Sequence, residues 1–294
     1  VPWDQDQVVY VWVDALINYL SALEYAQPGE DLRERYWPHV RHLIAKDILR
    51  FHCVFWPALL LSAGYEVPRR IFVHGYLTLD DRKISKSLGN VIDPLHLVDV
   101  YGSDAVRYWA TRSVQFGRDG SVSLAALHER YERELGNDLG NLVSRTTAMI
   151  AKYRDGRIPI APGAEGAPSL DALGQEVEKR LDEFDLTGAI DAIWDAVRAL
   201  NKFVADSKPW ERAKDEANAE ELGRVFYAPA DGIRVVAVAL HAYLPETTPR
   251  ILQALGQPDE FDWSFVAPGQ TVETEGVEPA PPLFPRVEAP AAAA

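Results

Sequence analysis

The hydrophobic pattern of this chain changes near residue 117. Before that point, short apolar runs rich in β-branched and aromatic residues alternate with stripes of helical spacing; after it, only helical stripes occur. Strands that alternate with helices form parallel β-α-β units, whose ligands bind at the carboxyl ends of the strands. The sequence therefore predicts an α/β domain over 1–120 and an all-α domain over 121–260. The predicted strands are 8–13 and 42–45, both buried, and the short strand 70–74.

Helix signals fit between and after these strands. Asp47 is predicted to cap a helix that Pro57 kinks. In the second half, a long helix is expected to begin at Ser123, and Pro209 fits the first turn of a short helix. Residues 155–168 are rich in Gly, Pro and Ala and predict a loop. The apolar stripe of the long helix comprises Leu124, Leu127, Tyr131, Leu135, Leu142, Thr146, Met149 and Ile150.

Composition excludes several classes of protein. The net charge of −14 argues against non-specific attraction to nucleic acid, which comes from neutralising phosphates. One cysteine, Cys53, excludes a disulfide framework and a multi-cysteine zinc site within this chain. No apolar run approaches the roughly 20 residues that span a bilayer, and no signal-like leader is present. We therefore expect a cytoplasmic setting, no membrane partner and no zinc.

The loop over residues 82–90 carries the most informative chemistry. Lys83 and Lys86 lie three apart, with Ile84, Ser85 and Ser87 beside them. Ammonium groups in a loop after a strand can hold a triphosphate and stabilise the charge on departing pyrophosphate, while hydroxyl groups donate to its oxygens. The competing interpretation is a solvated basic turn. The loop is not a P-loop, because the G-x-x-x-x-G-K-[ST] pattern is absent.

With its flanks, 74–78 and 90–94, this loop resembles the KMSKS loop of class I aminoacyl-tRNA synthetases, with Ile84 at the usual methionine position. The resemblance implies catalytic roles for Lys83 and Lys86, and ATP contacts from Ile84, Ser85 and Ser87. It also implies the second half of a Rossmann-like catalytic domain, followed by an α-helical bundle that binds the anticodon. The segment 283–287 resembles the family's return strap, so we expect a strap and an extended tail over 261–294.

Two segments are similar to the methionyl branch of that class. Residues 11–19 and 45–52 imply that Asp47 binds the ribose of ATP. Ala45 departs from the family's usual glycine, which bears on how closely the backbone approaches the nucleotide. The alternatives are a core aromatic for Trp12, a helix cap for Asp47 and a core histidine for His52. The implied pocket for the methionine side chain consists of Trp12, Ala15, Leu16, Tyr19, Ile48 and His52.

The helical half resembles the family's anticodon-binding domain. Asn141 and Arg145 lie four apart, on one polar shoulder of the long helix. The resemblance implies that they read bases of the CAU anticodon and that Trp210 stacks on one. The alternatives are a solvated helix flank for Asn141 and Arg145 and a helix-start anchor for Trp210.

The implied reaction joins L-methionine to tRNA(Met) with ATP and Mg²⁺. The family's His-Ile-Gly-His motif does not occur here, and because the chain starts with Val1 and holds one methionine, Met149, we expect it to be cut from something longer. We expect this polypeptide alone not to form methionyl-adenylate, and we expect a monomer. Two alternatives stay open: another class I specificity, such as leucine, isoleucine, valine or cysteine, and a non-catalytic tRNA-binding module.

Overall fold

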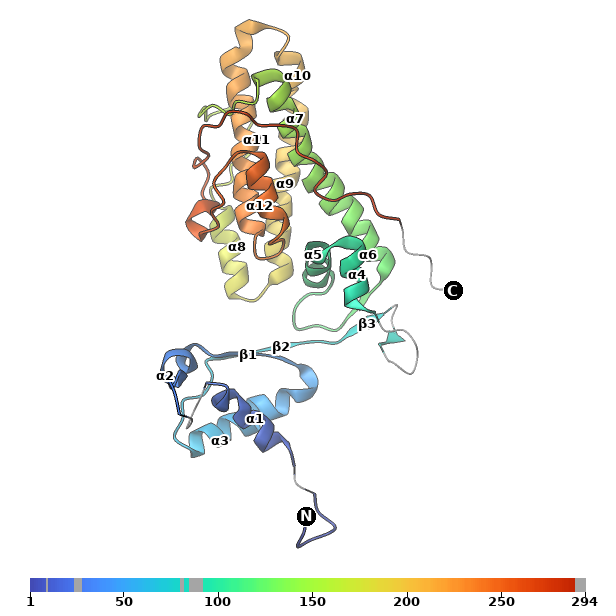
Figure 1. Ribbon diagram of the computed structural model, residues 1–294, viewed down its shortest axis with the longest axis vertical. Coiled ribbons are helices and arrows are strands. Elements are labelled where there is room, and N and C mark those ends of the chain that lie inside the picture. The colour runs from blue at the N-terminus through green and yellow to red at the C-terminus, as the bar shows by residue number, and fades with distance from the viewer. Residues whose placement is uncertain (9, 24–27, 80–81, 85–91, 289–294) are drawn as a thin grey trace. The chain divides into compact units, whose positions relative to one another are not determined.

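The computed structural model describes residues 1–8, 10–23, 28–79, 82–84 and 92–288. The chain divides into two compact units (Figure 1). The first, here called the α/β unit, is Val1–Leu77 with Gly117–Gly120. The second, the helical unit, is Thr78–Phe116 with Ser121–Ala294.

The α/β unit contains one parallel β-α-β connection. Strands β1 (Arg41–Ala45) and β2 (Arg70–His74) pair in parallel, and α3 (Trp56–Ser62) lies between them in the sequence. This confirms the strands predicted at 42–45 and 70–74. Helices α1 (Trp12–Ser21) and α2 (Arg33–Tyr36) precede β1. The core of the unit is formed by Leu16, Leu20, Trp37, Trp56 and Leu60.

The strand predicted at 8–13 is wrong. Helical hydrogen bonding begins in this run, where the Ala15 N–H donates to the Val11 carbonyl at 3.0 Å, and α1 starts at Trp12. Val8, Tyr10 and Val11 are exposed instead of buried. A short apolar run does not distinguish a strand from the first turn of a helix. The segment forms a helix because Leu16 and Leu20, which are four residues apart, lie on the same buried face.

Between β1 and α3 the backbone passes through two unusual turns. The 3₁₀ helix η2 (Lys46–Ile48) has no side-chain cap, so the N-cap role predicted for Asp47 is wrong. The π-helix η3 (Phe51–Phe55) follows, and the Trp56 N–H donates to the Phe51 carbonyl five residues back. Pro57 lacks the N–H that would continue an α-helical ladder. A wider π turn ahead of the proline accommodates this loss.

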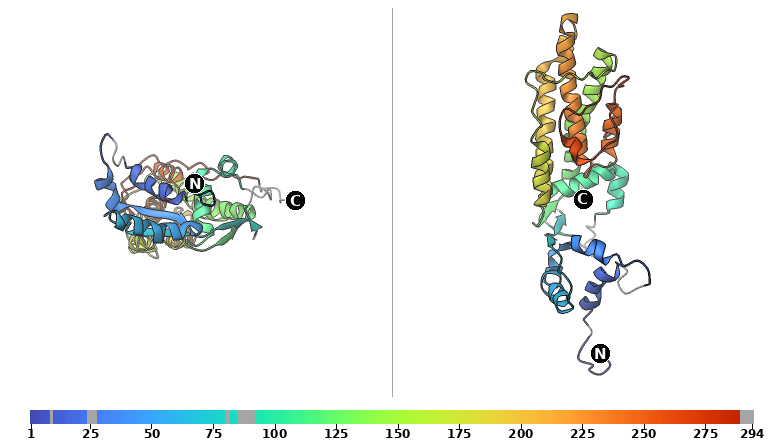
Figure 2. Two further views of the ribbon diagram at one scale, coloured as in Figure 1. Left: turned by 90° about the horizontal axis from the view of Figure 1, so that it is seen from below. Right: turned by 90° about the vertical axis from the view of Figure 1, so that its left-hand side faces the viewer.

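The helical unit is dominated by long helices. One rod is formed by α6 (Leu124–Arg130), the π-helix η5 (Tyr131–Gly140) and α7 (Asn141–Arg154) in succession. Helices α7, α9 and α11 contact one another and run side by side (Figures 1 and 2). The helices outside the rod are α4 (Pro94–Tyr101), α5 (Ser103–Ser113), α8 (Leu173–Asp182), α9 (Leu186–Ser207), α10 (Pro209–Arg212), α11 (Ala219–Leu240) and α12 (Thr247–Ala254). A three-stranded sheet has the order β4 (Arg82–Lys83), β3 (Leu77–Leu79), β5 (Gly120–Val122).

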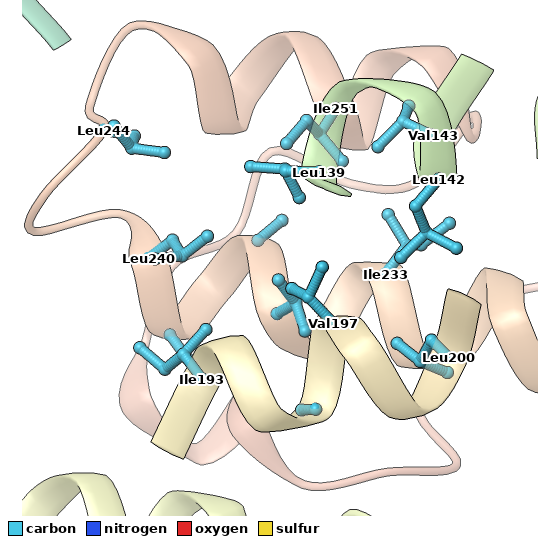
Figure 3. Close-up of a cluster of buried hydrophobic side chains, with 14 of the residues drawn as sticks. Leu139, Leu142, Val143, Ile193, Val197, Leu200, Ile233, Leu240, Leu244 and Ile251 are labelled. Carbon is cyan, nitrogen blue, oxygen red and sulfur yellow. The ribbon is translucent and has the colours of Figure 1, made fainter. Parts of the chain in front are cut away.

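The core of the helical unit confirms the predicted apolar stripes. Ser123 caps α6 by accepting from the Ala126 N–H at 3.1 Å, and Pro209 begins α10, as predicted. Side chains from η5, α7, α9, α11 and α12 converge in the close-up of Figure 3. The labelled residues are Leu139, Leu142, Val143, Ile193, Val197, Leu200, Ile233, Leu240, Leu244 and Ile251.

The C-terminal segment 271–287, here called the strap, crosses the helical unit in extended form. It pairs with the loop after α7, where the Ile158 N–H donates to the Thr274 carbonyl at 2.9 Å. Farther along, the Tyr131 hydroxyl donates to the Pro285 carbonyl at 2.6 Å. These contacts hold the strap against the rod. None of the helices in the described part of the chain is long and apolar enough to span a membrane.

Candidate functional site

A cluster of aromatic side chains joins α1 to η3, the turn that leads from β1 toward α3. The Tyr19 hydroxyl is 2.8 Å from His52 Nε2, and His52 Nδ1 is 3.0 Å from the Ile48 carbonyl. A carbonyl only accepts, so Nδ1 carries a proton, and in a neutral ring Nε2 then accepts from Tyr19. Burial raises the pKa of the Tyr19 hydroxyl, which keeps it protonated for this role. The structure thus joins two predicted pocket residues, one from α1 and one from η3.

An apolar hollow of about 280 Å³ adjoins this cluster. Trp12 stacks on Phe51 with ring centroids 4.2 Å apart and planes 8° apart, and its edge faces His52 at 6.1 Å. Such a surface accepts an uncharged side chain and offers no partner to a charged one. The lining consists of Tyr10, Trp12, Val13, Leu16, Phe51, Phe55, Ala58 and Leu59.

The predicted methionine-binding residues differ in how they are placed. Leu16 and His52 are buried, whereas Trp12, Tyr19 and Ile48 are half-buried, and Ala15 is exposed. Trp12, Tyr19, Ile48 and His52 come together through the contacts above. Leu16 lies in the core of the α/β unit as well as in the wall of the hollow. His52 is buried and lies outside the lining of the hollow, so its role as a pocket residue stays a prediction.

Asp47 projects from η2 at the end of β1 and is exposed. No hydrogen bond to its carboxylate is found within the described ranges. An unengaged carboxylate at the carboxyl end of a parallel strand lies where α/β sheets bind ligands. Ala45 ends β1 in an extended conformation, with φ −81° and ψ 157°, which any residue adopts.

Sequence reasoning missed an ion pair at the same edge. The Lys46 ammonium pairs with the Asp119 carboxylate and lies 4.4 Å from the centroid of the Tyr76 ring. Asp119 also accepts from the Tyr76 N–H at 2.8 Å, and these contacts lower the pKa of its carboxyl group. Gly75 is required beside them, because a Cβ there would lie 2.1 Å from the Arg118 carbonyl oxygen. No sequence motif links residues so far apart along the chain.

The predicted phosphate-binding loop falls largely outside the described residues. Ser85, Lys86 and Ser87 lie outside them, and for Lys83 only the backbone, which closes β4, is described. Ile84 is half-buried, as expected for an apolar residue that packs. The roles predicted for these residues stay predictions.

The predicted anticodon residues lie on the rod and on the short helix that contacts it. Asn141 and Arg145 are exposed on α7, and α10, which carries half-buried Trp210, contacts α7. The Asn141 amide donates to Asn137 Oδ1 at 3.4 Å, so a second amide side chain borders the same surface. Sequence reasoning missed Asn137 because it lies in η5, where π geometry changes the phase of the helical pattern.

The described residues include no group of three His, Cys, Asp or Glu side chains placed to hold a metal ion.

Comparison with known proteins identifies the family. The family model of class I tRNA synthetases (M) matches residues 1–147. The chain belongs to this family. The methionine–tRNA ligase of Bacillus subtilis is 41% identical over 298 residues, which cover 98% of this chain and 45% of the relative. That of Mycobacterium tuberculosis is 41% identical over 301 residues, covering 99% and 57%.

Solved structures give the same result. The Mycobacterium tuberculosis methionyl-tRNA synthetase in complex with methionyl-adenylate matches with a TM-score of 0.86 at 41% identity. The match covers 97% of this chain and 58% of that chain. The chain therefore has the fold of a large part of a class I synthetase, and it spans about half the length of the curated relatives it matches. Its relatives are aminoacyl-tRNA synthetases, which confirms the enzyme class predicted from the sequence.

Proposed function

We propose that this chain forms part of a methionine–tRNA ligase, which activates methionine with ATP and charges tRNA(Met). The family match and the cluster of Tyr19 and His52 support this proposal. The hollow that Trp12 and Leu16 help to line is the single observation that bears most on specificity, because an apolar, uncharged surface suits a thioether better than a charged or strongly polar side chain. The similarity to methionine–tRNA ligases favours methionine over the other class I specificities left open above.

The domain limits follow from the same proposal. Residues 1–120 form the second half of a Rossmann-like catalytic domain that includes the KMSKS-type loop, and 121–260 form a helical bundle that binds the anticodon. Residues 261–294 form the strap and tail. Support comes from the parallel β1–β2 pair in the first region and from the packed long helices in the second.

In the first reaction, the methionine carboxylate attacks the α-phosphate of ATP, which enters as its magnesium complex, and pyrophosphate leaves. Trp12, Ala15, Leu16, Tyr19, Ile48 and His52 hold the side chain of methionine. Asp47, exposed beyond β1, accepts from the ribose hydroxyls. Lys83 and Lys86 stabilise the charge on the departing pyrophosphate, and loss of one such donor lowers the rate by about 10²–10³-fold.

In the second reaction, the activated methionine passes to the terminal adenosine of tRNA(Met). Asn141 and Arg145 donate hydrogen bonds to anticodon bases, and Trp210 stacks on one of them. Their exposure on neighbouring helices supports this role. Because the net charge of −14 opposes general phosphate binding, recognition depends on such local contacts.

The test is binding of tRNA(Met), and of the same tRNA with an altered anticodon, to the 294-residue chain at physiological salt. We expect tighter binding of tRNA(Met), and we expect Trp210→Ala to remove the difference. Trp263→Ala is the matched control, because Trp263 is also half-buried and also lies in the first turn of a short helix. Equal binding of both tRNAs by the unsubstituted chain contradicts the anticodon proposal.

A second measurement concerns activation. We expect the isolated chain to show no methionine-dependent exchange of pyrophosphate into ATP, because it contains no His-Ile-Gly-His motif. Exchange by the isolated chain contradicts that expectation. Specific tRNA binding without exchange, even when the chain is joined to the remaining part of a ligase, would favour a non-catalytic tRNA-binding module.

A further inference from the structure

His42 lies directly beneath the tyrosine of the proposed methionine pocket. It is the second residue of β1, and 4% of its surface is exposed. Its ring packs against Tyr19 with centroids 4.4 Å apart and against His52 at 5.7 Å. Trp56, 1% exposed, completes the floor, 6.0 Å from the Tyr19 ring. Tyr19 therefore lies on a base made of one imidazole and one indole.

Hydrogen bonding fixes the protonation of His42. The Trp56 indole N–H points at His42 Nε2 from 3.2 Å, and an indole nitrogen only donates. Nε2 must therefore be unprotonated, which places the single ring proton on Nδ1. Burial, and secondarily the nearby His52, lower the pKa of His42 to about 4. Geometry and environment thus agree on a neutral imidazole.

We propose that His42 is a positioning residue for methionine: as a neutral acceptor for the Trp56 indole, it holds the Tyr19 ring at the angle that points its hydroxyl to His52. The inference rests on the proposed function and deepens it. His42 packs against the rings of Tyr19 and His52, so it acts on the proposed methionine-binding residues through these two rings. Without the acceptor, the buried Trp56 N–H has no partner, and both rings of the floor shift to satisfy it.

Three substitutions separate the acceptor from the volume of the ring. His42→Gln can place an amide oxygen near the position of Nε2, so it keeps the acceptor. His42→Asn is also an amide but reaches only the position of Nδ1, so it leaves Trp56 unsatisfied. His42→Phe keeps an aromatic ring with no acceptor. Trp56→Phe removes the donor, and in that background the three substitutions should become equivalent.

Kinetics are measured in a chimera in which residues 1–294 replace the matching part of the Mycobacterium tuberculosis methionyl-tRNA synthetase. In pyrophosphate exchange, we expect His42→Asn and His42→Phe to raise the KM for methionine about tenfold, the usual cost of an unsatisfied buried donor. The KM for ATP and kcat should stay within about twofold, and His42→Gln should restore most of the loss. If His42 had a purely structural role, all three variants would lose kcat and thermal stability to the same extent. That result would overturn the proposal.

The proposed function and the role of His42 are tested by separate measurements. A chimera that exchanges no pyrophosphate with methionine contradicts the function. The tautomer of His42 is then determined from two-bond ¹H–¹⁵N spectra of the 294-residue chain. The signal of His42 is identified by its loss in His42→Gln. We expect a proton on Nδ1 and a bare Nε2 at pH 7. A proton on Nε2, or the mixed tautomers of an unfolded chain, overturns the proposal.

Discussion

The two units differ in how much of their apolar surface they bury. In the helical unit, Leu139, Val197 and Ile233 are fully buried within one continuous core. In the α/β unit, Leu43 on β1 and Leu61 on α3 are 59% and 66% exposed. Parallel strands are normally covered on both faces, so β1 is an unusual case. The helical unit derives its stability from apolar packing, whereas the α/β unit depends more on a small core and on hydrogen-bonded rings.

This contrast matters for function because the two proposed sites lie on different kinds of support. The anticodon residues project from a rod whose inner face is packed, which fixes their positions. The placement of the proposed methionine residues depends on single hydrogen bonds, such as those joining Tyr19 to His52 and Trp56 to His42. We therefore expect the loss of a single hydrogen bond in the α/β unit to alter ligand binding. In the helical unit, we expect substitutions that disrupt the packed core to alter folding.

The largest effect is expected from the buried ion pair of α11. Arg234 and Asp231 pair at 2.9 Å and together bind the backbone of residues 265–271. Asp231→Ala leaves a buried arginine unpaired, and we expect it to lower the free energy of unfolding by about 3–5 kcal/mol. Urea denaturation followed by circular dichroism measures this. On the same helix, Arg224 pairs with Glu220 at the surface, so Arg224→Ala should cost less than about 1 kcal/mol; equal losses would contradict the packing argument.

Adjacent leucines of α3 provide a comparison within the α/β unit. Leu60 is 1% exposed and belongs to the small core, whereas Leu61 is 66% exposed. We expect Leu60→Ala to destabilise this unit by about 2–5 kcal/mol, because it leaves a cavity. Leu61→Ala should change stability by less than about 0.5 kcal/mol. Hydrogen exchange of β1 and β2 reports on this unit separately, and similar effects from both leucines would show that its core is not as assigned.

Acid should destabilise the α/β unit through His42. The pKa of this residue falls from 6.5 to about 4 on folding, so the unfolded state binds the proton more readily. Stability is therefore greatest above pH 6.5 and declines as the pH falls toward 4, by at most about 3 kcal/mol. Unfolding free energies from hydrogen exchange of this unit, measured between pH 7 and 4, test the slope. His42→Gln, which does not titrate, should flatten it, and an unchanged slope would assign the effect to other groups.

The same contrast explains which features were predictable from sequence. Stripes such as Leu135 and Leu142 predicted buried helix faces, because in the helical unit every stripe meets another helix. Residues 8–13 misled the prediction, since an apolar run indicates burial only when a partner surface covers it. Asp47 was assigned a cap because the sequence gives residue types and spacing but not the 3₁₀ turn that leaves its carboxylate exposed.

Pairs distant in sequence were beyond prediction for a different reason. The Tyr19–His52 contact was anticipated only as two members of one pocket, because their segments resemble the same family. The Lys46–Asp119 pair and the His42–Trp56 bond belong to no sequence motif. His42 sits in an alternating strand pattern, where a buried position is expected to hold an apolar residue. A buried histidine at such a position is the signal that could have been used.

The smallest effect is expected where the strap covers the rod. The Tyr131 hydroxyl donates to the Pro285 carbonyl, and its ring meets Phe284 edge-on at 6.0 Å. Tyr131→Phe removes one hydrogen bond and keeps the ring, so it should cost about 1 kcal/mol. The loss should be local, appearing as faster hydrogen exchange around residues 283–287 with little change in α9 and α11. Tyr153→Phe, on the same rod, is the control, since the Tyr153 ring stacks on Phe226 of α11. A global loss of protection in Tyr131→Phe would mean that the strap is an integral part of the helical core, and the contrast between the two units would then depend on the strap as well as on the helices.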